Sequence, residues 1–234
     1  MTFDMAAAAR QLDNPIWHAL SGAHSDFAIV LGNVRRYVPE VAPFAAVAEP
    51  ETGGFAELAL AIPQGGGAAL FTPQLVTAPP GMKVVVALEL QQMVATEFRP
   101  YDRPREMAPL TAADVPAMLE LVALTQPGPF GARTIELGGY LGIWDGGRLV
   151  GMSGERLRFD GFTEVSAVCV HPDYRGRGYA KALVSAVAET IARRGDMPFL
   201  HVLPDNRPAI ATYEALGFRA RRRLHLTRVQ HRQT

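Results

Sequence analysis

The chain has 234 residues, of which 48% are hydrophobic, and its 23 basic side chains balance 23 acidic ones. This composition excludes a mainly disordered chain, and the zero net charge gives no overall basic surface for nucleic acid or an anionic membrane. The single cysteine, Cys169, excludes an intrachain disulfide, a zinc site of several thiolates and an iron–sulfur cluster.

The sequence also contains no sign of a membrane segment or a leader. No run approaches the roughly 18 apolar residues that a membrane helix needs. Residues 1–15 place Asp4 ahead of a four-alanine stretch, which does not match a signal peptide. We therefore expect a cytoplasmic protein, monomer or homodimer, that binds neither membrane nor nucleic acid.

The first hundred residues have the pattern of a small α+β unit. Helices are expected at residues 15–20 and 55–62, and strands at residues 43–48, 68–71 and 83–95. The glycines at 65–67 lack the Lys-Ser/Thr that completes a phosphate loop, so we expect a turn there. No pattern before residue 100 indicates chemistry.

Residues 98–106, FRPYDRPRE, interrupt this composition. Two prolines and several charges follow the apolar stretch KVVVALELQQMVA. Such a change is typical of a domain boundary. We predict an N-terminal α+β unit over residues 1–98 and a second domain over residues 105–230.

The second domain begins with a short strand at residues 107–110. Thr111, followed by Asp114, predicts the start of a helix, and the Pro- and Gly-rich residues 126–133 predict its end. Two β-rich stretches on either side of Gly146 and Gly147 predict a hairpin, and a further strand is expected at residues 162–170.

The C-terminal residues are locally basic. From Arg219 onward there are six arginines and no acidic residue, and Leu224 and Leu226 alternate with polar neighbours. This alternation favours strands. A solvated strand face is the simplest interpretation, and a contact with nucleic acid is the alternative.

Residues 168–184, VCVHPDYRGRGYAKALV, predict a strand, a glycine loop and the start of a helix. Free N–H groups and the helix macrodipole converge at such a start, where Gly176 and Gly178 would let a ligand approach closely. Arg175 and Arg177 could add positive charge. The residues alone allow either an anion site or a plain strand-to-helix connection.

Residues 175–180, RGRGYA, resemble the R/Q-x-x-G-x-G/A signature of the GNAT superfamily of acyl-CoA-dependent N-acyltransferases. The later residues Asn206, Ala209, Tyr213, Gly217 and Phe218 fall on the N-x-x-A-x-x-x-Y-x-x-x-G-F pattern of the same family. The resemblance covers residues 105–230. It implies an α+β fold with a GNAT-like mixed central sheet flanked by helices. The N-terminal hundred residues match no part of the signature, and a degenerate half of the same fold, as in some glycine N-acyltransferase-like members, is one interpretation of them.

The resemblance also implies a site for acetyl-CoA or another acyl-CoA, and no metal. The strand ending at Val170 and a strand at residues 198–203 would be parallel neighbours that splay apart around the pantetheine. Asn206 would contact the pantetheine arm. The implied backbone and loop contacts are Val168, Val170, Arg175, Gly176, Arg177, Gly178, Tyr179, Ala180 and Lys181.

Amine attack on a thioester needs a group that removes a proton, because a typical alkyl ammonium has a pKa near ~10. Glu164, eleven positions before Arg175, matches the spacing of the catalytic glutamate in several histone-type members. Its alternative is a carboxylate paired with Arg156 or Arg158 across the sheet. Glu155 and His171 are lesser candidates for the base.

Tyr213 matches the tyrosine that protonates the departing thiolate in the family, with simple packing as its alternative. Cys169 is expected to be a buried, inert thiol on the sheet face opposite Val168 and Val170, and an acyl-enzyme formed through Cys169 and His171 is the alternative.

The expected function is transfer of an acetyl or short acyl group from acyl-CoA to an amine of a small molecule or amino acid. A non-catalytic acyl-CoA-binding sensor is the alternative. Arg133, Arg156 and Arg158 are candidates for binding a carboxylate of the acceptor.

Overall fold

The protein, described here by a computed structural model over residues 10–50, 55–101 and 105–232, contains two β-sheets. The smaller sheet has the order β1-β2-β3 and consists of β1 (Ala28–Leu31), β2 (Val34–Tyr37) and β3 (Ala45–Val47). The larger sheet has the order β4-β11-β5-β10-β9-β8-β7-β6. Its strands are β4 (Gly67–Thr72), β5 (Met82–Val94), β6 (Ala108–Leu110), β7 (Tyr140–Asp145), β8 (Arg148–Phe159), β9 (Phe162–Val170), β10 (Met197–Val202) and β11 (Arg219–His231).

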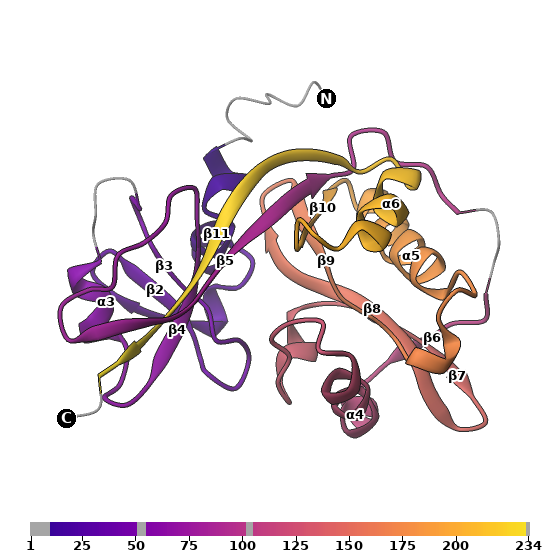
Figure 1. Cartoon of the computed structure of the whole chain (residues 1–234), viewed down its shortest axis with the longest axis horizontal. Helices are drawn as coiled ribbons and strands as arrows, with labels where there is room; N and C mark the ends of the chain where they lie inside the picture. Colours follow the sequence, from indigo (N-terminus) through magenta and orange to yellow (C-terminus); the bar gives the residue numbers. More distant parts are fainter. Residues whose placement is uncertain (1–9, 51–54, 102–104, 233–234) are drawn as a thin grey trace.

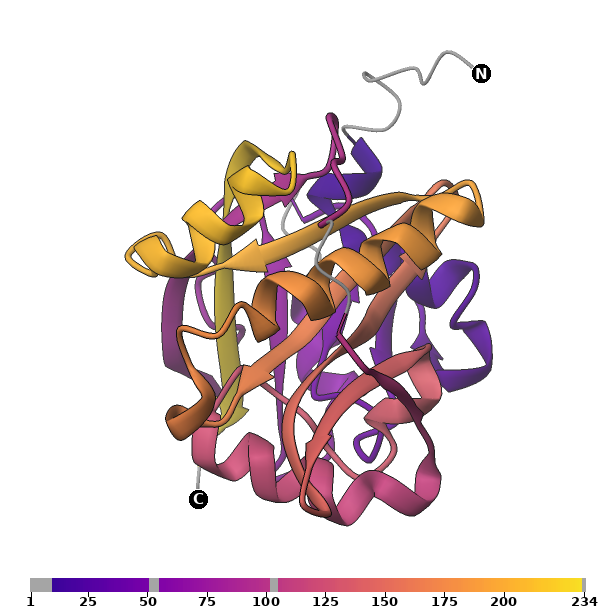
Figure 2. The ribbon, with the colours of Figure 1, turned by 90° about the vertical axis from the view of Figure 1, so that its right-hand side faces the viewer.

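Helices cover both faces of the larger sheet. Helices α5 (Tyr179–Arg193) and α6 (Arg207–Ala215) lie on one side of β8 and β9, and α4 (Val115–Thr125) lies on the other (Figures 1 and 2). Helices α2 (Pro15–Ser21) and α3 (Ala56–Ala61) belong to the N-terminal unit. The predicted α+β fold, with a mixed sheet flanked by helices and a smaller N-terminal unit, is confirmed. Among the described residues no helix has the length and apolar character that a membrane span requires.

Strand β5 connects the two halves of the chain. It pairs with β11 along its length and with β10 through residues 91–94, and the two long strands run side by side into the N-terminal unit (Figure 1). The first hundred residues therefore supply β4 and β5 to the larger sheet. The domain division between residues 98 and 105 stays a prediction, because residues 102–104 lie outside the described part of the chain, as do residues 1–9.

Local signals in the second half placed its elements correctly. Thr111 and Asp114 form the expected capping box, in which the Thr111 N–H donates to Asp114 Oδ2 at 2.7 Å. Helix α4 follows and ends at Gln126, which has a φ of 47°. Gly146 and Gly147, both at positive φ, make the turn of the predicted hairpin.

Strand β2, which the sequence did not predict, lies in the middle of the small sheet. Val34 and Tyr37 are buried at its ends, but two arginines separate them. The Arg35 guanidinium lies 3.8 Å from the Trp17 ring centroid, and Arg36 Nε donates to the Ala61 carbonyl at 2.7 Å. Both arginine stems thus pack against other parts of the protein. A polarity pattern treats charged residues as exposed, and for this reason it does not predict the strand.

Aromatic side chains fix the N-terminal unit against the larger sheet. Phe44 and Phe71 pack at a centroid distance of 5.2 Å, in the same core cluster as Phe159, Phe162 and Phe199 of strands β8, β9 and β10. Side chains of this size dominate the apolar area that a core buries. The N-terminal unit is therefore part of the same packed body as the predicted second domain.

Four of the five arginines of β11 face carboxylates of this chain. Arg219 lies 2.6 Å from Glu97, Arg222 lies 2.6 Å from Asp13, and Arg223 lies 2.5 Å from Glu89. The simplest interpretation of the basic C-terminal residues was a solvated strand face; β11 is the strand, and ion pairs with the chain's own carboxylates were not predicted.

Candidate active site

The parallel strands β9 and β10 pair only at their beginnings. Their register is Met197 with Phe162, Pro198 with Thr163 and Phe199 with Glu164, and no later pairing between them exists in the described residues. Beyond this point β9 pairs with β8 alone, while β10 pairs with β5. The expected pair of parallel, separating strands is confirmed, and the inner edge of β9 after Glu164 is without a strand partner.

A bulge distorts β9 along this free edge. Ala167 has a φ of 51°, and the register with β8 shifts between the pairs Cys169–Met152 and Ser166–Gly154. Val168 packs in the cluster beneath α5 and α6, whereas Cys169 packs in the cluster beneath α4. Cys169 is buried, and burial raises the pKa of its thiol to about 11. A thiol with that pKa is inert near neutral pH.

The glycine loop leads directly from β9 into α5. Gly176 and Gly178 have φ values of 74° and 80°, and Gly178 is the N-cap of the 15-residue helix. A Cβ at Gly176 would meet nothing within 4 Å, and one at Gly178 would lie 3.2 Å from the Tyr101 hydroxyl. The loop is thus open at Gly176, while Tyr101 lies beside Gly178. The backbone N–H groups of the loop and the positive end of α5 form an arrangement that fits a pyrophosphate.

Cationic side chains surround this loop. Arg175 and Arg177 are exposed, and the Arg177 guanidinium lies 4.7 Å from the Tyr174 ring centroid. Lys181 Nζ lies 4.7 Å from the ring of Tyr101. These positive charges can offset the negative charges of a phosphate group.

Two further residues lie at the loop, and the sequence did not lead us to predict them there. Arg105 Nη2 donates to the Arg177 carbonyl at 3.3 Å, and the backbone N–H of Tyr101 donates to Ser185 Oγ at 2.7 Å. Both come from the Pro-rich segment that we interpreted only as a boundary. Their sole sequence signal was the charge and aromatic content of FRPYDRPRE.

Helix α6 carries the second family motif. Asn206 is its N-cap, and its side-chain oxygen accepts a hydrogen bond from the Ala209 N–H at 3.3 Å. Tyr213 is 8% exposed and packs against Phe218 at a centroid distance of 6.1 Å. Burial, with a smaller contribution from Cys169, raises the pKa of Tyr213 to about 12. Its hydroxyl is therefore protonated near neutral pH, as a proton donor must be.

Glu164 lies at the separation point of β9 and β10 and is completely buried. Arg156 donates to both of its oxygens, from Nε at 2.8 Å and from Nη2 at 2.7 Å, and His201 Nδ1 lies 2.7 Å from Oε1. Burial alone would raise the pKa of Glu164, but the Arg156 charge and these hydrogen bonds outweigh burial and hold the pKa at about 2. The alternative interpretation, pairing with Arg156, is confirmed. The role of Glu164 as a base stays a prediction.

The N-terminal unit closes over this ion pair. The Arg156 guanidinium lies 5.0 Å from the Phe44 ring centroid and 5.8 Å from that of Phe71. Gln92 of β5 lies 3.1 Å from His201 Nε2. Residues from before residue 100 therefore line the point where β9 and β10 separate, although no pattern there indicated chemistry.

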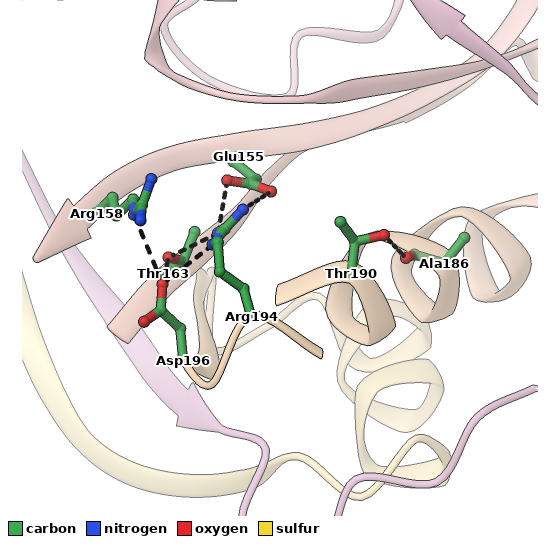
Figure 3. A network of polar contacts seen from close by, with 7 residues as sticks. All are labelled: Glu155, Arg158, Thr163, Ala186, Thr190, Arg194 and Asp196. Atoms are coloured by element: carbon green, nitrogen blue, oxygen red, sulfur yellow. Dashed lines mark hydrogen bonds and ion pairs between the residues drawn. The ribbon is translucent and has the colours of Figure 1, made fainter. Parts of the chain in front are cut away.

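The lesser base candidates also have partners. Arg194, just after α5, donates to both oxygens of Glu155, at 3.2 and 2.9 Å, in the polar network that Figure 3 shows. In the same network Asp196 accepts a hydrogen bond from Thr163 at 2.7 Å. His171 Nε2 lies 2.5 Å from Arg148 Nη2. This network ties the end of α5 to β8 and β9.

The arginines proposed to recognise an acceptor carboxylate each face a carboxylate of the chain. Arg133 donates to Glu136 at 2.7 and 2.8 Å, and Arg158 lies 3.7 Å from Asp196. Arg156 is held by Glu164, as described above. Their role with an acceptor stays a prediction. To bind an acceptor carboxylate, each arginine would have to release the carboxylate of the chain that it now contacts.

Comparisons with known proteins agree with this geometry. The family described as FR47-like protein matches residues 140–228. N-alpha-acetyltransferase RimI of Mycobacterium tuberculosis is 36% identical over 126 residues, which cover 49% of this chain and 78% of that protein. A mycothiol acetyltransferase of Corynebacterium aurimucosum is 43% identical over 58 residues, a local match that covers 24% of this chain and 19% of that protein.

A solved structure matches nearly the whole chain. It is the crystal structure of a GNAT-family protein from Novosphingobium aromaticivorans, with 39% sequence identity and a TM-score of 0.89, and the match covers 95% of this chain and 99% of that one. The match therefore includes most of the N-terminal hundred residues. The chain therefore belongs to the GNAT superfamily and is an enzyme of the N-acetyltransferase class, which transfers an acyl group from CoA.

Proposed function

We propose that the protein transfers an acetyl or short acyl group from acyl-CoA to the amine of a small molecule or amino acid. The observation that carries the proposal is the free inner edge of β9 leading into the glycine loop at the start of α5. The edge is suited to hydrogen-bond the pantetheine amides as an added strand would, through Val168 and Val170. The donor itself supplies the activated thioester carbonyl.

The chain's own residues have separate roles in this proposal. Gly176, Gly178 and Arg177 bind the pyrophosphate, with Arg175, Tyr179, Ala180 and Lys181 completing the loop. Asn206 contacts the pantetheine arm from the start of α6. Tyr213, kept protonated by burial, donates a proton to the departing thiolate.

The acceptor amine has to lose a proton before or during attack. We assign this step to Glu164, directly or through water, with Glu155 as the alternative. The pairing of Glu164 with Arg156 and its pKa of about 2 make it a weak base in this state. The assignment therefore requires that acceptor binding change this pairing.

Release of CoA thiol measures the proposed activity. The assay uses acetyl-CoA and propionyl-CoA with amino acids, amino-acid amides, alkylamines and short peptides with a free α-amine. We expect acceptor-dependent thiol release together with saturable CoA binding. CoA binding without turnover for any amine would favour the sensor alternative, and absence of CoA binding would refute the proposal. We also propose, as the sequence led us to expect, that it acts in the cytoplasm without a membrane partner.

A further inference from the structure

Tyr140 is a buried tyrosine whose hydroxyl has no hydrogen-bond partner. The residue is 3% exposed, and its Oη lacks a partner among the described residues. Buried hydroxyls in proteins are nearly always hydrogen-bonded, because an unpaired one costs free energy. The hydroxyl therefore points to a partner that the protein itself does not supply.

The position of Tyr140 brings its ring close to β9. Tyr140 is the first residue of β7 and stands opposite Gly154 of β8. Its ring lies directly against Gly154, since a Cβ there would be 2.3 Å from the ring Cδ1. Gly154 pairs in turn with Ser166 of β9, one residue before the bulge at Ala167. The ring thus lies over β8 in one core cluster with Cys169 of β9, and Glu164 of β9 acts electrostatically on the hydroxyl.

The surroundings of Tyr140 are apolar apart from two ion pairs, Arg156–Glu164 and Arg194–Glu155. It shares a core cluster with Cys169, Met152 and Met118, and Phe130 packs edge-on to its ring at 5.7 Å. Burial raises the pKa of Tyr140, so the hydroxyl keeps its proton and can donate it. Arg156 and Glu164 act on it electrostatically but are occupied with each other.

Three other buried polar atoms lack a hydrogen-bond partner among the described residues. Asp13 Oδ1 lies in the N-terminal unit and is ion-paired with Arg221 at 2.7 Å. Thr227 belongs to β11, and Arg35 belongs to β2 in the small sheet. Neither strand pairs with β9. Tyr140 therefore differs from them in standing next to the proposed point of acyl transfer.

We propose that Tyr140 is an acceptor-binding residue, whose hydroxyl donates a hydrogen bond to the carbonyl oxygen of an α-amino carbonyl compound. Amino acids, amino-acid amides and peptide N-termini belong to this class. The inference rests on the proposed acyl transfer and narrows its acceptor. A site built to hydrogen-bond one oxygen discriminates against an acceptor without that oxygen, because the buried hydroxyl then stays unpaired.

The test compares alaninamide with 3-methylbutan-2-amine, an alkylamine of similar size that lacks the carbonyl. Wild type should prefer alaninamide. Tyr140→Phe should reduce the ratio of the two kcat/KM values by about 10-fold, through a higher KM for alaninamide, while CoA affinity stays unchanged. An equal loss with both amines, or no loss, would overturn the proposal.

A second measurement does not depend on turnover. Without acceptor, Tyr140→Phe removes an unpaired buried hydroxyl and should raise Tm by about 2–4 °C. Tyr37→Phe is the matched control, because the Tyr37 hydroxyl is also buried but lies 2.7 Å from His24 Nδ1. Tyr37→Phe should lower Tm and leave the acceptor preference unchanged. A lower Tm for Tyr140→Phe would show an internal partner and refute the proposal.

Calorimetry separates failure of this inference from failure of the proposed function. If neither amine is acetylated, the acyl-transfer proposal fails for these acceptors. Binding of alaninamide to the CoA-bound protein, lost in Tyr140→Phe and kept in Tyr37→Phe, would still establish recognition by Tyr140. Equal binding to wild type and Tyr140→Phe would refute it.

Discussion

Arg156 and Glu164 face each other across strands β8 and β9 in a two-point ion pair that is closed off from solvent, with hydrogen bonds of 2.8 and 2.7 Å. The pair stands where β9 and β10 stop pairing, and Phe44 and Phe71 of the N-terminal half cover it. Breaking such a pair leaves the remaining charge buried and uncompensated. The pair therefore stabilises the fold at the same place where the acceptor is proposed to react.

Glu164→Gln should lower the free energy of unfolding by about 3–5 kcal/mol, because Arg156 would keep its charge without a buried partner. Urea unfolding at pH 7 measures this change. Glu136→Gln is the control, since Glu136 makes the same two-point contact with Arg133 on the surface. The control should change stability little. Equal effects of the two substitutions would contradict the buried-pair interpretation.

The same pair predicts an acid-sensitive stability. The pKa of Glu164 is depressed from 4.5 to about 2, so the folded state binds its proton more weakly than the unfolded state. Its contribution, roughly 3 kcal/mol, is complete above pH 4.5 and is lost as the pH falls toward 2. Unfolding measured between pH 2 and 6 should show this decrease, and it should be much smaller in the double variant Arg156→Met with Glu164→Leu.

Kinetics can separate the structural role of Glu164 from a catalytic one. If Glu164 is the base, Glu164→Gln shifts the acidic limb of the kcat/KM profile. If Glu164 only anchors Arg156, the variant keeps the profile and loses stability. The proposed assignment of Glu164 as the base predicts the first result, measured below the Tm of the variant, and an unchanged profile would leave Glu164 as an anchor for Arg156.

Tyr213→Phe should lower kcat by roughly 100-fold, because it removes the proposed proton donor and keeps the buried ring. CoA affinity should change less than two-fold. Single-turnover measurements ensure that the chemical step is observed. Full kcat under those conditions would mean that Tyr213 only packs in the core and that water protonates the thiolate.

The elements of residues 105–232 were predictable because their signals are local. The capping residues Thr111 and Asp114, the glycine pair at 146 and 147 and the apolar spacing of α5 each specify structure within a few positions. The family motifs are equally short. These signals sufficed for the glycine loop and for the parallel pair β9 and β10.

The remaining features depend on contacts between distant parts of the chain. Nothing within residues 82–94 indicates that β5 lies between β10 and β11, since its partners are more than a hundred residues away. Arg105 donates to the Arg177 carbonyl of the loop although the two residues are 72 positions apart in the chain. The bulge at Ala167 contains no glycine, so the sequence contains no signal for it. The partner of Glu164 could not be chosen between Arg156 and Arg158 without knowing which of them lies on the same side of the sheet.

Gly178→Val should abolish stabilisation by CoA. At a hundred times its Kd, CoA should stabilise wild type by about 2.7 kcal/mol. A β-branched side chain is strained at a φ of 80° and would approach Tyr101 at the N-terminus of α5. Gly195→Ala is the control, because Gly195 has a φ of 93° but follows the other end of α5. The control should lose stability and keep the CoA effect, and a CoA effect in Gly178→Val equal to that of wild type would contradict the pyrophosphate assignment.

A fragment that begins at residue 98 should fail to fold, although it contains both family motifs. It would lack β4 and β5, so β11 would lose its partners on both sides and β10 would lose its antiparallel neighbour. The aromatic core beneath β8, β9 and β10 would also be exposed. Circular dichroism and CoA titration of the fragment test this expectation, with a fragment that begins at residue 10 as the control. A folded, CoA-binding fragment from residue 98 would instead establish an independent second domain and restrict the N-terminal unit to acceptor recognition.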